Sequence, residues 1–165
     1  MATVTLHGEP CQTHSELPGI DKIAPDFTLV DGDLFNVHLA NFSGKKKLIY
    51  VLPSLDTPVC ALSTAKLNKL AAERADVAVL VVSADLPFAQ ARFREAEGVD
   101  HITTLSTMRN HDFPRDYGVL LRTGPLAGIC ARAVIVLDEE NRVRYAAFVD
   151  EIGDEPDFAP AFAAL

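Results

Sequence analysis

Two short, uninterrupted apolar segments constrain the fold of this chain more than any other feature. Residues 48–52 (LIYVL) and 77–82 (VAVLVV) contain no charged side chain, which is typical of strands that are buried on both faces of a sheet. Between them, the apolar residues of the segment 61–73 recur at near-helical spacing. A strand, a helix and a second strand in this order favour an α/β fold.

The remaining segments continue this alternation of strands and helices. Pro87 opens a predicted helix over residues 87–97, because proline is tolerated in the first turn of a helix. We also predict strands at 26–30, 36–39 and 102–105, a short helix at 112–117, a hairpin of 131–137 with 143–148, and a last helix within 157–165. Together they predict a central mixed sheet flanked by helices.

The first residues predict a small hairpin ahead of this sheet, with a turn at 8–10 between two short strands. The chain has 165 residues, 48% of them hydrophobic, and no internal repeat or linker, so it is long enough to build one core. We therefore expect a single domain over residues 1–165, in which residues 1–17 are an N-terminal hairpin extension.

The charge of the chain argues against nucleic-acid binding, which depends on clustered Lys and Arg. The net charge is −8, and the one basic run, residues 45–47, directly precedes an apolar segment. No apolar run is long enough to span a bilayer, and residues 1–9 lack the pattern of a signal peptide. We expect a cytoplasmic protein that binds neither nucleic acid nor a membrane.

The three cysteines favour a reactive thiol over a structural scaffold. Cys11, Cys60 and Cys130 are odd in number and form no C-x-x-C pair, which suits neither a disulfide framework nor a zinc site. The five histidines are dispersed, and no glycine-rich phosphate loop is present. We expect no metal and no organic cofactor.

Cys60 stands out because of its position along the chain. It follows a predicted buried strand and lies at the start of a predicted helix, where partial positive charge and unpaired N–H groups stabilise a thiolate. Thr57 can offer a hydroxyl to a bound peroxide, and Pro53 shapes the loop. The alternative is that Cys60 is a small buried core residue, as most free cysteines are.

The spacing of Pro53, Thr57 and Cys60 resembles the active-site pattern of the peroxiredoxin superfamily. Further blocks are similar to its bacterial thiol peroxidase branch, and they lie in order along most of the chain: 83–90, 92–93, 105–107, 109–110, 124–126, 131–133 and 150–152. The resemblance implies a thioredoxin-like fold with an N-terminal hairpin. It also implies a homodimer, with contacts near Leu55, Arg109 and Tyr117.

The resemblance also implies a role for each of four side chains. Cys60 matches the peroxidatic cysteine and Thr57 the peroxide-binding hydroxyl. Pro53 matches the residue that shields the nucleophile, and Arg132 the arginine that stabilises the thiolate and the transition state. Arg132 lies within an apolar stretch, where an unpaired charge is costly, so a surface role fits it less well. The implied reaction oxidises Cys60 to sulfenic acid, and thioredoxin or a small thiol is the expected reductant.

One position departs from the family pattern. Relatives often place a resolving cysteine directly after the Arg-Phe pair of the helix at 87–97, where this chain has Arg94. Three alternatives follow: a one-cysteine enzyme, an unusual resolver at Cys130 or Cys11, or an engineered replacement at this position. Cys130 is the candidate resolving cysteine, because it stands two residues before Arg132 in a predicted strand and would then share its face. The alternative, which small cysteines in apolar runs favour, is that Cys130 is an inert core residue and that Gly128 shifts the start of the strand.

The sequence thus favours a thiol peroxidase that reduces hydrogen peroxide and organic hydroperoxides. A peroxide sensor, or redox relay, that passes oxidation to a partner protein is the alternative, and the missing resolving cysteine motivates it. A disulfide oxidoreductase of the thioredoxin fold would need a C-x-x-C pair, but Thr57 and Ser63 occupy the positions three residues away from Cys60.

Overall fold

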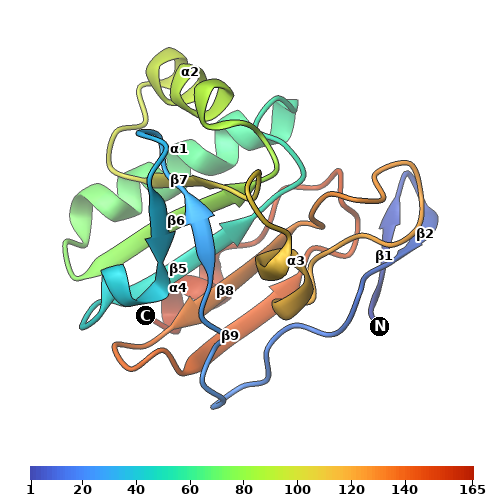
Figure 1. Ribbon diagram of the computed structural model, residues 1–165, viewed down its shortest axis with the longest axis horizontal. Coiled ribbons are helices and arrows are strands. Elements are labelled where there is room, and N and C mark those ends of the chain that lie inside the picture. Colours follow the sequence, from blue (N-terminus) through green and yellow to red (C-terminus); the bar gives the residue numbers. More distant parts are fainter.

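A seven-stranded mixed sheet forms the centre of the computed structural model, which describes all residues, 1–165 (Figure 1). The strand order is β4-β3-β7-β6-β5-β8-β9. The strands are β3 (Thr28–Val30), β4 (Asn36–His38), β5 (Lys46–Val51), β6 (Val77–Ser83), β7 (Thr103–Ser106), β8 (Ala133–Leu137) and β9 (Val143–Phe148). Strands β5, β6 and β7 run parallel, and β8 and β9 continue the sheet antiparallel, so the predicted mixed sheet is confirmed.

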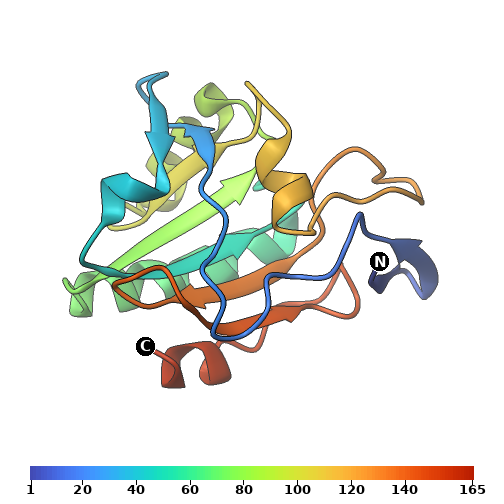
Figure 2. The same cartoon turned by 60° about the horizontal axis from the view of Figure 1, so that its bottom comes forward.

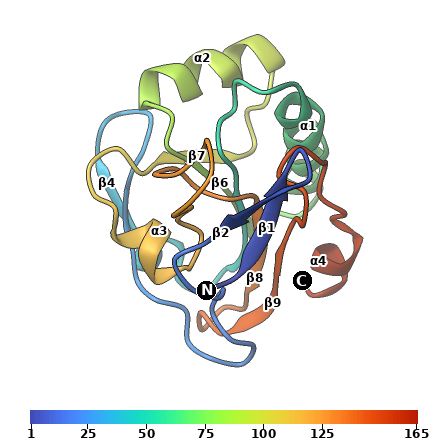
Figure 3. The same cartoon turned by 90° about the vertical axis from the view of Figure 1, so that its right-hand side faces the viewer.

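Helices cover both faces of this sheet. They are α1 (Pro58–Glu73), α2 (Pro87–Glu97), α3 (Asp112–Asp116) and α4 (Ala159–Ala163), with a 3-10 helix η1 at Leu39–Phe42. Helices α1 and α4 lie on one side of the sheet and α3 on the other (Figure 3). None of these helices is long and apolar enough to cross a membrane.

The central strand β5 separates two hydrophobic clusters, because successive side chains of a strand point to opposite faces. Leu48 and Tyr50 pack with Leu67 of α1 and Phe158, whereas Ile49 and Val51 belong to a second cluster, which includes Phe113 of α3. All residues of 48–52 are fully buried. The absence of charged side chains that predicted this strand therefore follows from burial on both faces.

The N-terminal hairpin pairs β1 (Thr3–Leu6) with β2 (Glu9–Gln12) and lies beside one end of the central sheet (Figure 2). Its turn contains His7 and Gly8, which both have positive φ values. Isolated bridges join Thr5 to Glu151 and Thr13 to Leu121. The hairpin is thus tied to the segments before and after β8 and β9.

Two predicted boundaries differ from the structure in ways that affect the site. Helix α1 begins at Pro58 rather than at residue 61, because proline can occupy the first helical position. Strand β8 begins at Ala133 rather than at residue 131, since Cys130 and Ala131 pair instead with Leu120 and Val119. Arg132 therefore lies just before the strand.

Candidate active site

The loop from β5 to α1 places Cys60 in the first turn of the helix. Thr57 is the N-cap residue, a position where a threonine hydroxyl normally accepts a bond from a helical N–H group. Here the Thr57 side chain makes no such bond, and its Oγ1 lies 2.8 Å from the Sγ atom of Cys60. The N-cap hydroxyl is thus directed at the thiol.

Three polar atoms surround the Cys60 sulfur, although the residue is completely buried. Besides Thr57 Oγ1, they are the Ser54 carbonyl oxygen, which accepts a hydrogen bond from the thiol at 2.9 Å, and Nη1 of Arg132, which donates to the sulfur at 3.5 Å. Thr57 and Arg132 can both donate hydrogen bonds to an ionised sulfur, and such charge-assisted bonds are the stronger kind. These two donors suit a thiolate nucleophile, whereas the Ser54 carbonyl can bond only to the protonated thiol.

Arg132 is only 2% exposed, and two further groups fix its guanidinium. Its Nε donates to the carbonyl oxygen of Ile152 at 2.8 Å, and its Nη1 donates to the Tyr50 hydroxyl at 2.7 Å. Burial lowers the pKa of Arg132, but Tyr50 and Cys60 oppose this and bring the pKa above its ordinary value. Burial raises the pKa of Tyr50. Both groups therefore keep their protons at neutral pH.

Tyr50 and Ile152 were not recognised as site residues from the sequence. Tyr50 is the only residue of the apolar run 48–52 with a polar group, which is a local signal for a buried hydrogen bond. Ile152 contributes only its backbone carbonyl, for which no side-chain pattern exists.

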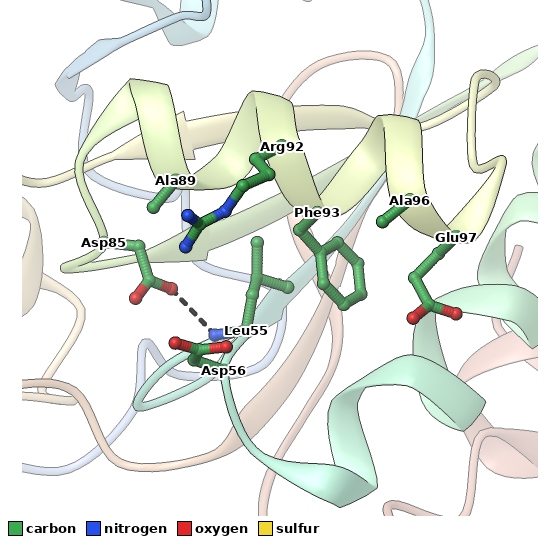
Figure 4. A pocket seen from close by; sticks show the side chains of 8 residues that line it. All are labelled: Leu55, Asp56, Asp85, Ala89, Arg92, Phe93, Ala96 and Glu97. Atoms are coloured by element: carbon green, nitrogen blue, oxygen red, sulfur yellow. Dashed lines mark hydrogen bonds between the residues drawn. The ribbon is translucent and has the colours of Figure 1, made fainter.

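Asp85 holds the loop that carries the Ser54 carbonyl. Its carboxylate accepts hydrogen bonds from the Ser54 hydroxyl, the Leu55 N–H group and the Ser83 hydroxyl, each at 2.7 Å. Figure 4 shows the carboxylate of Asp85 directed at the backbone of Leu55. In the sequence, Asp85 lies in the segment 83–90, which resembles the thiol peroxidase branch, but the resemblance implied no role for it.

A groove of about 250 Å³ lies between this loop and α2, and it is shown in Figure 4. Leu55 and Asp56 line one side, and residues of α2, among them Arg92 and Phe93, line the other. Cys60 is not among the lining residues, so the groove does not open onto the thiol. No group of three or more His, Cys, Asp and Glu side chains is placed to hold a metal ion.

The structure brings three of the four predicted site residues into contact: Cys60, Thr57 and Arg132. Pro53, the fourth, is buried in the same loop next to Ser54. All three cysteines are free thiols.

The expectation that Cys130 shares a face with Arg132 is wrong. Cys130 packs in the cluster of Ile49 and Val51, whereas Cys60 packs in the cluster on the opposite face. Burial raises the pKa of the Cys130 thiol to about 12. Side chains alternate between the two faces of the sheet only within a strand. Cys130 precedes β8 and pairs with Leu120, so the alternation along β8 does not extend to it.

Four other residues from the sequence analysis are placed as follows. Arg94 is half-buried on α2, and its Nε has no hydrogen-bond partner. Leu55 and Tyr117 are buried within the chain, and the Tyr117 hydroxyl donates to the Pro25 carbonyl, so their side chains are not available for the dimer contact expected from the sequence. Arg109 is exposed and bonds to Asn36.

The fold and the site define a redox-active thiol protein: a thioredoxin-like sheet with a buried thiol in the first turn of a helix, contacted by an arginine. The family model described as Redoxin matches residues 20–165, and the chain belongs to this family.

Similar proteins agree with this assignment. The chain is 44% identical, over all 165 residues, to a thiol peroxidase of Mycobacterium bovis, and the match covers 99% of that protein. A peroxiredoxin-like protein from Aquifex aeolicus is 38% identical with a TM-score of 0.92, covering 99% of this chain and 95% of the other. A thiol peroxidase from Chromobacterium violaceum is 29% identical with a TM-score of 0.89, covering 98% and 93%. The predicted thioredoxin-like fold is thereby confirmed.

Proposed function

We propose that Cys60 is the nucleophile of a thiol-dependent peroxidase that reduces hydrogen peroxide and organic hydroperoxides. The relatives named thiol peroxidase support the activity. The observation that supports the residue is the contact of its sulfur with both Thr57 Oγ1, at 2.8 Å, and Arg132 Nη1, at 3.5 Å.

The first half of the reaction needs only groups that already surround the sulfur. The Cys60 thiolate attacks the distal oxygen of the peroxide, an S–O bond forms, and the O–O bond breaks. The other oxygen leaves with the electron pair of that bond and takes up a proton, giving water or an alcohol. Thr57 and Arg132 orient the peroxide and stabilise the charge that develops on its oxygens, while Pro53 shields the reaction from solvent.

The second half returns the sulfenic acid to a thiol. An external thiol attacks the Cys60 sulfur and releases water, and a second thiol then reduces the mixed disulfide, so that two thiols are oxidised for each peroxide reduced. Thioredoxin or a small thiol serves as this reductant. We favour a one-cysteine cycle, because Arg94 stands where relatives carry the resolving cysteine and Cys130 packs on the opposite face.

The test combines a single-turnover experiment with a turnover experiment. Mixing with hydrogen peroxide, quenching with a thiol-alkylating reagent and mass spectrometry should show Cys60 oxidised far faster than a free thiol. Cys60→Ser should remove this reaction. Steady consumption of peroxide with thioredoxin or dithiothreitol supports the enzyme, whereas one equivalent of oxidation followed by arrest would favour the peroxide sensor.

We also propose a homodimer in the cytoplasm. Exposed apolar side chains support self-association near the expected contacts: Phe35 is 69% exposed close to Arg109, and Phe88 is 67% exposed at the start of α2. Three free cysteines are consistent with a reducing compartment. Light scattering should give the mass of a dimer, and a monomer at micromolar concentration would contradict this part of the proposal.

A further inference from the structure

The catalytic geometry depends on how the Arg132 guanidinium is held, because an arginine side chain has many rotamers. No carboxylate bonds to it. Its neutral partners are the Tyr50 hydroxyl on β5 and the Ile152 carbonyl, which fixes Nε at 2.8 Å. Tyr50 lies in a central strand, but Ile152 lies in a turn between β9 and α4. The position of this carbonyl therefore needs a separate explanation.

The N-terminal hairpin holds the backbone around Ile152. The Ile152 N–H group donates to the carbonyl oxygen of Thr5 at 2.8 Å, and the Thr5 N–H group donates to the carbonyl oxygen of Asp150 at 2.7 Å. The Ile152 side chain is 2% exposed and packs with Val4 and Cys11 of the hairpin. Backbone bonds and apolar contacts thus attach this turn to β1 and β2.

Glu151 adds a clamp next to Ile152. Its carboxylate accepts the Thr5 hydroxyl at 2.7 Å and the backbone N–H groups of His7 and Gly8 at 2.9 and 3.1 Å. The positive φ values of His7 and Gly8 suit a turn whose successive N–H groups point at one anion. The Thr5 hydroxyl, followed by these N–H groups, lowers the pKa of Glu151 to about 2, so the clamp is fully charged at neutral pH.

We propose that the N-terminal hairpin is a positioning element for Arg132, acting through the Glu151 clamp and the Ile152 carbonyl. The inference rests on the proposed role of Arg132 in peroxide reduction. Thr5 and Glu151 are positioning residues, since they contact neither the sulfur nor the guanidinium. Loosening the clamp should let the guanidinium move away from the Cys60 sulfur.

The test is a double-mutant cycle on the rate of Cys60 oxidation by hydrogen peroxide, followed by quenching and mass spectrometry. Arg132→Lys lacks the Nε bond to Ile152 and should react about a hundredfold more slowly. Glu151→Ala should react about tenfold more slowly in the wild-type background, because misplacing a catalytic group lowers the rate. In the Arg132→Lys background, Glu151→Ala should have no further effect.

The control is Glu155→Ala, which removes a carboxylate of the same connecting segment that pairs with Lys66 on the surface, and it should leave the rate unchanged. Thr5→Val removes only the hydroxyl that bonds to Glu151, and it takes the place of Glu151→Ala in the same cycle if that variant fails to fold. A normal rate for Arg132→Lys would refute the role of Arg132 itself. If Arg132→Lys is slow but the Glu151 or Thr5 variant reacts normally, or slows both backgrounds equally, the positioning role is wrong.

Discussion

Removing the Asp85 carboxylate should loosen the active-site loop without touching the thiol. Asp85 accepts three hydrogen bonds, and two of the donors, Ser54 and Leu55, belong to that loop. The Ser54 carbonyl lies 2.9 Å from the Cys60 sulfur and accepts from the Thr57 hydroxyl at 3.2 Å. A shift of this loop therefore moves two of the three groups that contact the thiol.

The size of the effect follows from which donors can find new partners. The Ser54 and Ser83 hydroxyls can rotate, but the N–H group of Leu55 is fixed, and a buried donor without a partner costs about 1–3 kcal/mol. The bonds from the Ser54 and Ser83 hydroxyls to the carboxylate are also partly lost. Together these losses should make Asp85→Ala lower the free energy of unfolding by about 2–4 kcal/mol. Asp85→Asn keeps an acceptor for Leu55 and should cost about 1 kcal/mol.

Urea unfolding measures the stability, and quenched single-turnover oxidation measures the reactivity of Cys60. Asp85→Ala should react about tenfold more slowly with peroxide, and Asp85→Asn should lie between it and the wild type. An Asp85→Ala protein as stable as the wild type would show that these hydrogen bonds do not hold the loop. A stability loss with an unchanged oxidation rate would show that loop position does not control the thiol.

Three further predictions concern single groups. Thr57→Val keeps the shape of the side chain but removes the hydroxyl 2.8 Å from the sulfur, so Cys60 oxidation should slow about a hundredfold, whereas Thr57→Ser should stay near wild type in the same assay. Cys130→Ala should leave turnover with dithiothreitol unchanged. In the wild-type protein, peptide mapping after one equivalent of peroxide should find no disulfide between Cys60 and Cys130. Finding that disulfide would contradict the one-cysteine cycle. The free energy of unfolding should fall as the pH rises from about 9 toward 12. Burial raises the pKa of Cys130 to about 12, so its thiol stays protonated in the folded state over this range, whereas the same thiol ionises in the unfolded chain. In urea unfolding across this range, Cys130→Ala should show a smaller fall.

The elements that sequence reasoning located well are those with local signals at their ends. Helix α2 spans the predicted residues because Pro87 occupies its first turn and Gly98, with a φ of 64°, ends it in the left-handed conformation. The contact of Thr57 with Cys60 was also predictable, since residues three apart meet within one turn.

The long-range part of the site had no such signal. Arg132 is 72 residues from Cys60, and only the family resemblance pointed to it. The clamp between Thr5 and Glu151 joins residues 146 apart. Thr5 lies in no pattern that distinguishes it from a surface position, and Glu151 lies in the resembling block 150–152, from which no role for it followed. The prediction for Cys130 failed for a related reason: the alternation of faces holds only within a strand, and β8 begins three residues later.

The two cysteines that lie on either side of the central sheet show why burial alone does not decide reactivity. Cys60 and Cys130 are both completely buried. Around Cys130 the neighbours are apolar, and burial raises the pKa of the thiol to about 12, as expected when a charge would have no partner. The sulfur of Cys60 instead faces a guanidinium that no carboxylate neutralises, so the positive charge of Arg132 is available to the sulfur. Because attraction between charges grows as water is excluded, burial strengthens this contact once the sulfur carries a negative charge.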